Sequence, residues 1–161
     1  MNQASADGDE VKTFQELELS AAMETILLVE DSKFLRIATE RVLTKAGYQV
    51  ICAGDGEEAL SLTTSSLPDL VVLDMLLPKL SGPEVLRALK KNALTAHIPV
   101  LVLSSLSQKN EDTLLKDGAA AFLEKGPLLE NPSLLLKTIK TALTKKTAAC
   151  SASASPAKVN S

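Results

Sequence analysis

Short runs of apolar residues alternate along the chain with longer segments in which apolar residues recur every three or four positions. The short runs predict strands at 25–29, 48–52, 70–73, 99–103 and 120–123. The periodic segments predict helices around 34–42, 59–62, 85–89, 114–115 and 135–143. Gly47 and Gly118 follow the first and fourth helices, where left-handed caps are common. Asn131 and Pro132 predict the start of the last helix.

The predicted strands are apolar throughout, without the polar alternation of a strand that faces water on one side. Strands of this kind suit a parallel sheet whose two faces are both covered by helices. The regular alternation of strands and helices implies right-handed crossover connections between neighbouring parallel strands. We therefore expect an α/β fold, a doubly wound five-stranded parallel sheet with five surrounding helices.

The length of 161 residues and the hydrophobic content of 45% predict one folded domain. We place this domain at 23–146. Residues 1–22 form an N-terminal extension, either a polar leader or one weak helix, and Met23 is a second candidate for the translation start. Residues 147–161 are rich in Ser and Ala and are expected to form a disordered low-complexity tail.

Composition and charge argue against several classes of function. Aromatic residues make up 2% of the chain and the net charge is −3, so neither stacking platforms nor a basic surface for nucleic acid is expected. The sequence has no signal-peptide pattern and no apolar run near the roughly 20 residues that span a bilayer. Cys52 and Cys150 show neither metal-ligand nor disulfide spacing. These features favour a reduced cytoplasmic protein without a membrane segment.

Polar residues that could carry chemistry follow the predicted strands. They are Glu30 and Asp31 after the first strand, Asp74 after the third, Ser104 after the fourth and Lys125 after the fifth. In open parallel sheets, ligand sites lie outside the carboxyl ends of the strands, where the strand order reverses. Clustered carboxylates offer the hard oxygen ligands that Mg²⁺ prefers. A lysine and a hydroxyl beside them could hold phosphoryl oxygens.

Four segments, VEDS, VVLDMLLPKLSG, IPVLVLSS and AAAFLEKG, together resemble the receiver domain of two-component response regulators. The resemblance covers roughly residues 24–145. Each motif is weak alone, but Asp31, Asp74, Ser104 and Lys125 follow in order at separations of 43, 30 and 21 positions. The resemblance implies a flavodoxin-like sheet with strand order 2-1-3-4-5.

The resemblance also implies roles for individual residues. Asp74 matches the phosphoacceptor, and Lys125 matches the family lysine that holds a phosphoryl oxygen. The expected Mg²⁺ ligands are Glu30, Asp31, Asp74 and the backbone carbonyl of Leu76. Ser104 matches the switch hydroxyl, and Phe122 matches the aromatic side chain that changes rotamer on the fifth strand.

Family members take a phosphoryl group from a phosphohistidine on a histidine kinase or a histidine phosphotransfer protein. They catalyse this transfer to themselves and a slow autodephosphorylation, and are not enzymes otherwise. Phosphorylation alters a face made by the fourth helix, the fifth strand and the fifth helix. The expected protein is a stand-alone receiver without a DNA-binding output domain, whose output is contact with a downstream protein. A homodimer is left open.

The sequence departs from the family pattern at three places. Glu30 stands where aspartate is commoner, so its carboxylate is expected to reach the metal through water. Phe122 lacks the hydroxyl of the frequent tyrosine. Lys125 is followed by Gly126 and Pro127 rather than directly by proline, which leaves a cis bond only between those two residues and changes the setting of the lysine.

Two leucines predict a long-lived phosphoryl group. The positions that commonly tune hydrolysis in the family, two residues after the acceptor and two after the switch hydroxyl, are Leu76 and Leu106. Neither side chain can orient an attacking water. We therefore expect slow autodephosphorylation.

Two alternatives belong to other functional classes. A phosphatase of the haloacid-dehalogenase kind uses a second aspartate two residues after its nucleophile as a general acid, but Leu76 occupies that position and cannot transfer a proton. A receiver-like docking module that no longer depends on phosphorylation is the second alternative. The altered sequence after Lys125 and the presence of Phe122 are compatible with that module, whereas the presence of Asp31, Asp74, Ser104 and Lys125 together argues against it.

Overall fold

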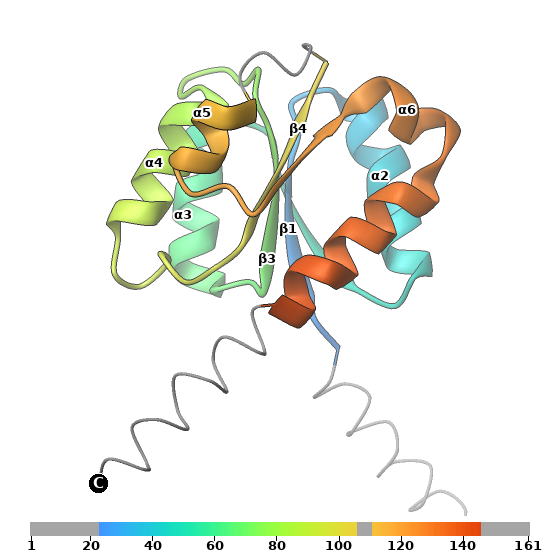
Figure 1. Cartoon of the computed structure of the whole chain (residues 1–161), viewed down its shortest axis with the longest axis horizontal. Coiled ribbons are helices and arrows are strands. Elements are labelled where there is room, and N and C mark those ends of the chain that lie inside the picture. Colours follow the sequence, from blue (N-terminus) through green and yellow to red (C-terminus); the bar gives the residue numbers. More distant parts are fainter. Residues whose placement is uncertain (1–22, 106–110, 146–161) are drawn as a thin grey trace, which may run out of the picture.

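Five parallel strands form one sheet with the order β2-β1-β3-β4-β5, as the sequence predicts. The computed structural model describes residues 23–105 and 111–145. The strands are β1 (Thr25–Val29), β2 (Gln49–Ala53), β3 (Leu70–Asp74), β4 (Val100–Ser104) and β5 (Ala121–Glu124). Their carboxyl ends lie along one edge of the sheet, at the top of Figure 1. Asp74 and Ser104 are the last residues of their strands rather than the first residues after them.

Helices cover both faces of this sheet. They are α2 (Lys33–Lys45), α3 (Gly56–Ser66), α4 (Gly82–Lys91), α5 (Glu111–Lys116), α6 (Lys125–Glu130) and a C-terminal helix at 132–145. Helices α3, α4 and α5 lie on one side, and α2, α6 and the C-terminal helix lie on the other (Figure 1). The five predicted helices are confirmed, and the short α6 is an addition.

The apolar pattern did not predict α6, because its second and third residues are Gly126 and Pro127. Proline is tolerated in the first turn of a helix, where the backbone N–H groups have no partner within the helix. The described residues contain no cis peptide bond, so the cis bond left open for Gly126 and Pro127 is not present. Lys125 therefore begins a helix directly after β5.

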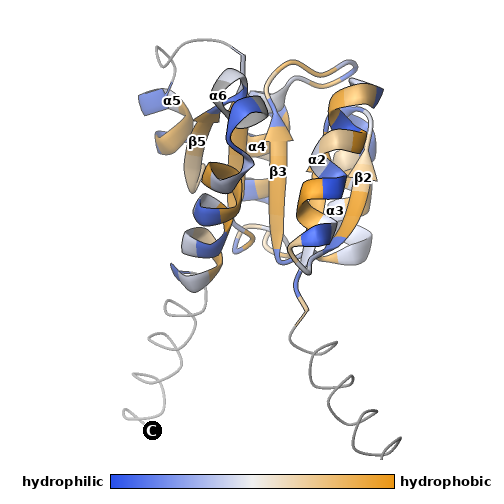
Figure 2. Cartoon of the chain, turned by 90° about the vertical axis from the view of Figure 1, so that its right-hand side faces the viewer, coloured by the Kyte–Doolittle hydropathy of each residue, from blue (hydrophilic) through white to orange (hydrophobic). Residues whose placement is uncertain are grey.

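Two apolar layers form the core, one on each face of the sheet. Leu27, Val71 and Val102 pack with α3 and α4 side chains such as Leu86. The alternate strand residues pack against α2 and the C-terminal helix, where Ile139 is fully buried. The strands are hydrophobic along their length, whereas the helices are mixed (Figure 2). The core therefore holds the strand ends in fixed register beneath the polar edge.

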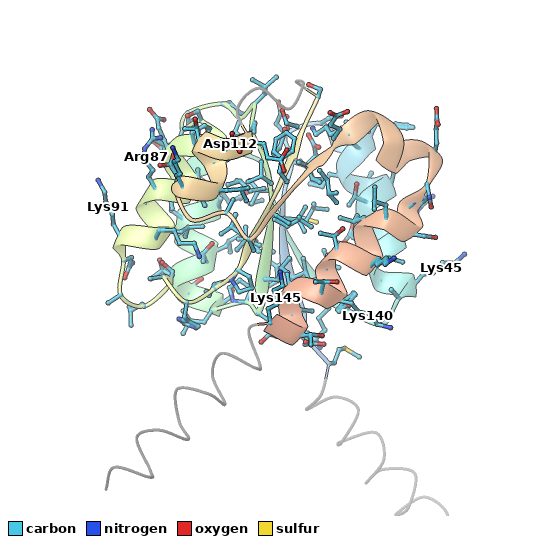
Figure 3. All side chains as sticks on the ribbon, viewed as in Figure 1. Lys45, Arg87, Lys91, Asp112, Lys140 and Lys145 are labelled. Carbon is cyan, nitrogen blue, oxygen red and sulfur yellow. The ribbon has the colours of Figure 1, made fainter. Side chains whose placement is uncertain are left out.

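The outer faces of the helices carry the charged side chains. Lys45, Lys91 and Lys140 project away from the sheet (Figure 3). Among the described helices, none has the length and apolar character needed to cross a membrane. The predicted N-terminal extension at 1–22, the whole of the predicted tail at 147–161 and the position of Leu106 lie outside the described residues.

Polar caps start three helices next to the carboxyl edge. Ser32 caps α2, Asp55 caps α3, and Ser81 forms a capping box with Glu84 at the start of α4. The predicted caps at the opposite edge are also present, with Gly47 at a φ of 102° after α2. The loops that follow β1, β2 and β3 therefore each lead into a capped helix.

Gly82 permits close contact between α4 and the end of β3. A Cβ atom on Gly82 would lie 2.6 Å from the carbonyl oxygen of Asp74 and 2.6 Å from Cα of Met75. We predict that Gly82→Ala lowers the free energy of unfolding by about 2 kcal/mol, because the backbone of β3 would have to shift. Urea denaturation followed by circular dichroism measures this change.

Gly126→Ala is the matched control for that measurement. Gly126 is exposed in α6, and a Cβ there would meet nothing within 4 Å. Alanine should leave stability unchanged or raise it by about 0.5–1 kcal/mol, since glycine is a poor helix former. Equal effects of the two substitutions would contradict the close packing of Gly82 on β3.

Candidate functional site

The polar residues at the carboxyl ends of β1 and β3 meet where the strand order reverses. Glu30 follows β1, Asp74 ends β3, and the two strands are hydrogen-bonded neighbours. Glu30 and Asp74 are each only 3% exposed, whereas Asp31 is exposed. One oxygen from each of the three carboxylates lies within 4.8 Å of the others. The sequence prediction that these acids converge is therefore correct.

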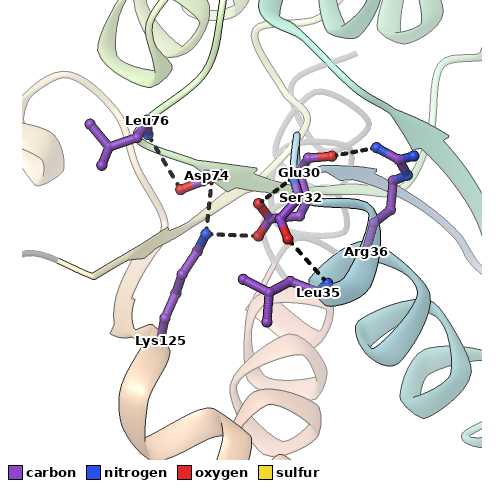
Figure 4. Close-up of polar contacts among 7 residues, drawn as sticks. All are labelled: Glu30, Ser32, Leu35, Arg36, Asp74, Leu76 and Lys125. Carbon is purple, nitrogen blue, oxygen red and sulfur yellow. Dashed lines mark hydrogen bonds and ion pairs between the residues drawn. The ribbon is translucent and has the colours of Figure 1, made fainter.

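Lys125 brings a positive charge between two of these carboxylates. Its Nζ lies 2.7 Å from Oε1 of Glu30 and 2.9 Å from Oδ2 of Asp74 (Figure 4). The lysine side chain is 17% exposed. The insertion of Gly126 before the proline therefore does not keep the ammonium from the acidic pocket.

Backbone contacts hold the carboxylates on both sides of the pocket. The Ser32 N–H donates to Oε2 of Glu30 at 3.2 Å, and the Leu76 N–H donates to Oδ1 of Asp74 at 3.3 Å. The Arg36 guanidinium donates to the Glu30 carbonyl at 2.9 Å (Figure 4). Both oxygens of Glu30 and both of Asp74 thus have donors.

Sequence reasoning missed the contributions of Ser32 and Arg36. Ser32 carries a signal that could have been used, because serine directly before a periodic segment is a common helix N-cap. Its hydroxyl accepts a hydrogen bond from the Leu35 N–H. Arg36 carries no such signal, since its contact with the Glu30 carbonyl depends on how α2 packs beside β1.

The buried charges shift each other's protonation. Burial raises the pKa of Glu30, and the nearby Asp74 carboxylate adds to this, although the hydrogen bond from Lys125 opposes it. Burial alone would lower the pKa of Lys125. The hydrogen bonds to Glu30 and Asp74, together with their negative charges, outweigh burial and raise the pKa of Lys125 above its ordinary 10.5. The ammonium is therefore held in its charged form.

The acidic cluster has the chemistry of a divalent-metal site. Glu30, Asp31 and Asp74 present only oxygen donors, and exposed Asp31 leaves the cluster open on one side. Hard divalent cations such as Mg²⁺ bind through carboxylates while retaining several waters. Leu76, the source of the predicted carbonyl ligand, lies in the loop directly after β3. The residues present therefore fit a divalent cation.

Ser104 and Phe122 lie on the α5 side of the acidic pocket. Ser104 is 2% exposed at the end of β4, and Phe122 is a half-buried residue of β5 that packs against the core. Both line a cavity of about 280 Å³, together with Leu76 and Leu114. The structure thus places the two predicted switch residues beside one cavity.

A doubly wound parallel sheet with acids and a lysine at the point where its strand order reverses defines a flavodoxin-like α/β domain. The pocket at this point is acidic and has the side chains of a site for a metal ion and a phosphate group. The family model for the response regulator receiver domain matches residues 26–140. Because that match covers more than half of the chain, the chain belongs to the response regulator receiver domain family of two-component systems. Receiver domains are signalling modules rather than catalytic enzymes, and their phosphoryl donors are histidine kinases.

Curated relatives and solved structures agree with this membership. The gliding motility regulatory protein of Myxococcus xanthus is 45% identical over 105 residues, which is 64% of this chain and 13% of that protein. The alkaline phosphatase synthesis transcriptional regulatory protein PhoP of Bacillus subtilis is 39% identical over 101 residues, 62% of this chain and 41% of that protein. The chain therefore spans less than half the length of these relatives.

Two solved structures show the same architecture. The Vibrio cholerae chemotaxis protein CheY4 superposes with a TM-score of 0.68 at 31% identity, over 74% of this chain and 98% of that one. The CheY-like receiver domain protein from Methanospirillum hungatei gives a TM-score of 0.71 at 27% identity, over 78% of this chain and 97% of that one. The similarity therefore covers nearly all of each of those chains.

Removal of the Lys125 charge should destabilise the fold, because two carboxylates would remain buried without their cation. We predict that Lys125→Met lowers the free energy of unfolding at pH 7 by about 2–3 kcal/mol. A group with a raised folded-state pKa stabilises the fold fully below its unfolded-state pKa and loses that contribution as the pH rises through the folded-state value. The difference from the unsubstituted protein should therefore persist from pH 7 to the ordinary lysine value of 10.5 and shrink above it.

Chemical denaturation across this pH range measures the Lys125 effect. Glu30→Gln is the matched control, because it keeps a side-chain acceptor for the ammonium and leaves one carboxylate for one lysine. Its effect at pH 7 should stay below about 1 kcal/mol. A Lys125→Met protein as stable as the parent at pH 7 would show that the ion pairs do not support the fold.

Proposed function

We propose that this receiver accepts a phosphoryl group on Asp74 from a phosphohistidine of a histidine kinase or a histidine phosphotransfer protein. The observation that carries the proposal is the position of the Asp74 carboxylate, buried at the strand edge, 2.9 Å from the Lys125 ammonium and beside two further acids. In the transfer, an Asp74 oxygen forms a bond to phosphorus while the bond from phosphorus to the histidine nitrogen breaks. The imidazole leaves with the electron pair of that bond.

Positive charge is the main requirement of this reaction, because a carboxylate and a phosphoryl group repel each other. Lys125 would hold one phosphoryl oxygen after exchanging part of its contact with Asp74. Glu30, Asp31, Asp74 and the Leu76 carbonyl would hold Mg²⁺, which supplies the remaining charge neutralisation at the phosphoryl oxygens. The exposed side of the pocket at Asp31 offers the entry route for a donor.

Phosphorylation would be read out through Ser104 and Phe122. The Ser104 hydroxyl would donate to an added phosphoryl oxygen, and Phe122 has the adjoining cavity of about 280 Å³ into which its ring could turn. The output surface would then be the face formed by α5, β5 and the C-terminal helix, for a downstream protein or for a second copy of the chain. Because its phosphoryl donor would be a histidine kinase or a histidine phosphotransfer protein, we expect the protein to work in the cytoplasm.

Acetyl phosphate labelling tests the phosphoacceptor. We predict that the purified protein gains one phosphoryl group with acetyl phosphate and Mg²⁺, and that Asp74→Asn abolishes the gain because an amide oxygen is a poor nucleophile. Intact mass measures both results. Asp69→Asn is the matched control at the opposite end of β3, where the side chain accepts a hydrogen bond from the Thr25 N–H at 2.8 Å and lies far from the pocket edge.

Omission of Mg²⁺ should also prevent labelling of the unsubstituted protein. Labelling that persists in Asp74→Asn would assign the acceptor to another residue. No labelling of a folded, Mg²⁺-binding protein would instead favour a docking module that works without phosphorylation.

The lifetime of the phosphoryl group should depend on Leu76. This side chain is 57% exposed two residues after the acceptor and cannot orient water, so slow hydrolysis is expected. We predict that Leu76→Asn speeds loss of the label by at least roughly tenfold, since a polar side chain there can position a water for attack. The decay of the label by mass spectrometry measures the rate, and Leu76→Met is the apolar control. Equal decay in all three proteins would contradict a role for this position.

A further inference from the structure

Lys79 has an unusual backbone conformation in the loop between β3 and α4. Its φ is 69°, and Leu67 is the other described residue besides glycine with a positive φ. This left-handed conformation is unfavourable for a residue with a Cβ atom and persists only where surrounding contacts hold it. The same loop contains Leu76, whose N–H meets Oδ1 of Asp74. The conformation of Lys79 therefore bears on the acidic pocket.

The Lys79 ammonium forms ion pairs with two carboxylates at the start of α3. Its Nζ lies 3.5 Å from Oδ2 of Asp55 and 4.0 Å from Oε2 of Glu57. The other Asp55 oxygen accepts the Glu58 N–H at 2.8 Å as the helix cap. That hydrogen bond and the ammonium of Lys79 hold the pKa of Asp55 below its ordinary range. Asp55 thus joins the cap of α3 to the loop after β3.

Backbone contacts place the rest of the loop against the same helix end. The Gly56 N–H faces the Pro78 carbonyl at 3.4 Å, and the Leu80 N–H donates to that carbonyl at 2.8 Å. A Cβ on Gly56 would collide with Leu80, so only glycine permits this approach. The Gly82 N–H closes the loop onto the Met75 carbonyl at 2.9 Å. Lys79 is the charged residue of the loop at 75–81, and its ion pairs join this loop to the start of α3.

We propose that Asp55 and Lys79 are positioning residues that hold the β3–α4 loop in the conformation that presents Leu76 to the acidic pocket. The Asp55 carboxylate compensates for the unfavourable backbone conformation of Lys79. The loop then keeps the Leu76 N–H on Asp74 and, on the proposed function, its carbonyl available to Mg²⁺. The inference rests on that proposed metal site.

Three substitutions separate positioning from charge. Lys79→Met removes the ion pairs but keeps a side chain that disfavours the left-handed conformation. Lys79→Gly also removes the ion pairs, but glycine adopts that conformation without strain. Asp55→Asn keeps an oxygen to accept the Glu58 N–H and removes the attraction for Lys79. Lys91→Met, at an exposed lysine at the end of α4, controls for the loss of one positive charge.

The measurement is the Mg²⁺ dissociation constant by isothermal titration calorimetry, at fixed ionic strength and well below each variant's melting temperature. Lys79→Met and Asp55→Asn should each weaken Mg²⁺ binding by roughly fivefold, the scale expected when a strained residue loses its support. Lys79→Gly should stay within roughly twofold of the parent, as should Lys91→Met. The recovery by glycine is a result that loss of charge alone cannot give.

Other results would overturn the inference. Tighter Mg²⁺ binding in both Lys79 variants would mean that the lysine acts only through its charge, and unchanged binding in all variants would mean that the ion pair has no positioning role. If Lys79→Met unfolds, the double variant Asp55→Asn with Lys79→Gly tests the same inference. Its Mg²⁺ affinity should return towards that of the parent, since glycine should remove the effect of losing the Asp55 carboxylate. A parent protein that binds no Mg²⁺ would refute the proposed metal site itself, whereas a parent that binds it normally confines any failure to the Asp55 and Lys79 contact.

Discussion

Compensation among buried charges is the constraint on which this site depends. Glu30 and Asp74 are almost completely removed from solvent at the end of an apolar sheet, where an isolated carboxylate is strongly disfavoured. The Lys125 ammonium touches both and is held in its charged form by them. One lysine for two buried acids still leaves an excess of negative charge, which exposed Asp31 increases. The pocket is therefore built to attract a further cation, and the proposed Mg²⁺ site follows from that imbalance.

The topology explains why a lysine fills this role. Neighbouring strands lie about 4.8 Å apart, so a side chain from the end of β5 must cross β4 to reach the acids of β3 and β1. A lysine side chain is long enough to do so. Because α6 begins at Lys125, the main chain leaves the edge of the sheet directly after this residue. Ser104 ends the strand that is crossed. The order of the strands thus sets which residue types can serve at each strand end.

The sequence was sufficient for features that depend on local pattern, and insufficient for contacts between distant loops. Continuous apolar runs located every strand to within one residue, and the parallel topology then brought Asp31, Asp74 and Lys125 to one edge. The helix at Lys125 was missed because Gly126 and Pro127 commonly end helices rather than occupy their first turn. The contact of Asp55 with Lys79 was also missed. These residues lie in different loops, and only the packing of α3 against the loop after β3 brings their charges together.

The loop after β3 and the residues of β4 and β5 that are proposed to switch share one cavity near Asp74. The loop after β3 is fixed by the Gly56 contact, the closing bond of Gly82 and the Lys79 ion pairs, and a close-packed contact has little room to adjust. Leu76 of this loop lines the cavity of about 280 Å³ together with Ser104 and Phe122. Packed structures respond to a local change by shifting between discrete arrangements, and such a shift needs space. Under the proposed function, charge added at Asp74 is therefore transmitted towards β4, β5 and α5, because the loop is held by its own contacts whereas the Phe122 ring has the space of this cavity beside it.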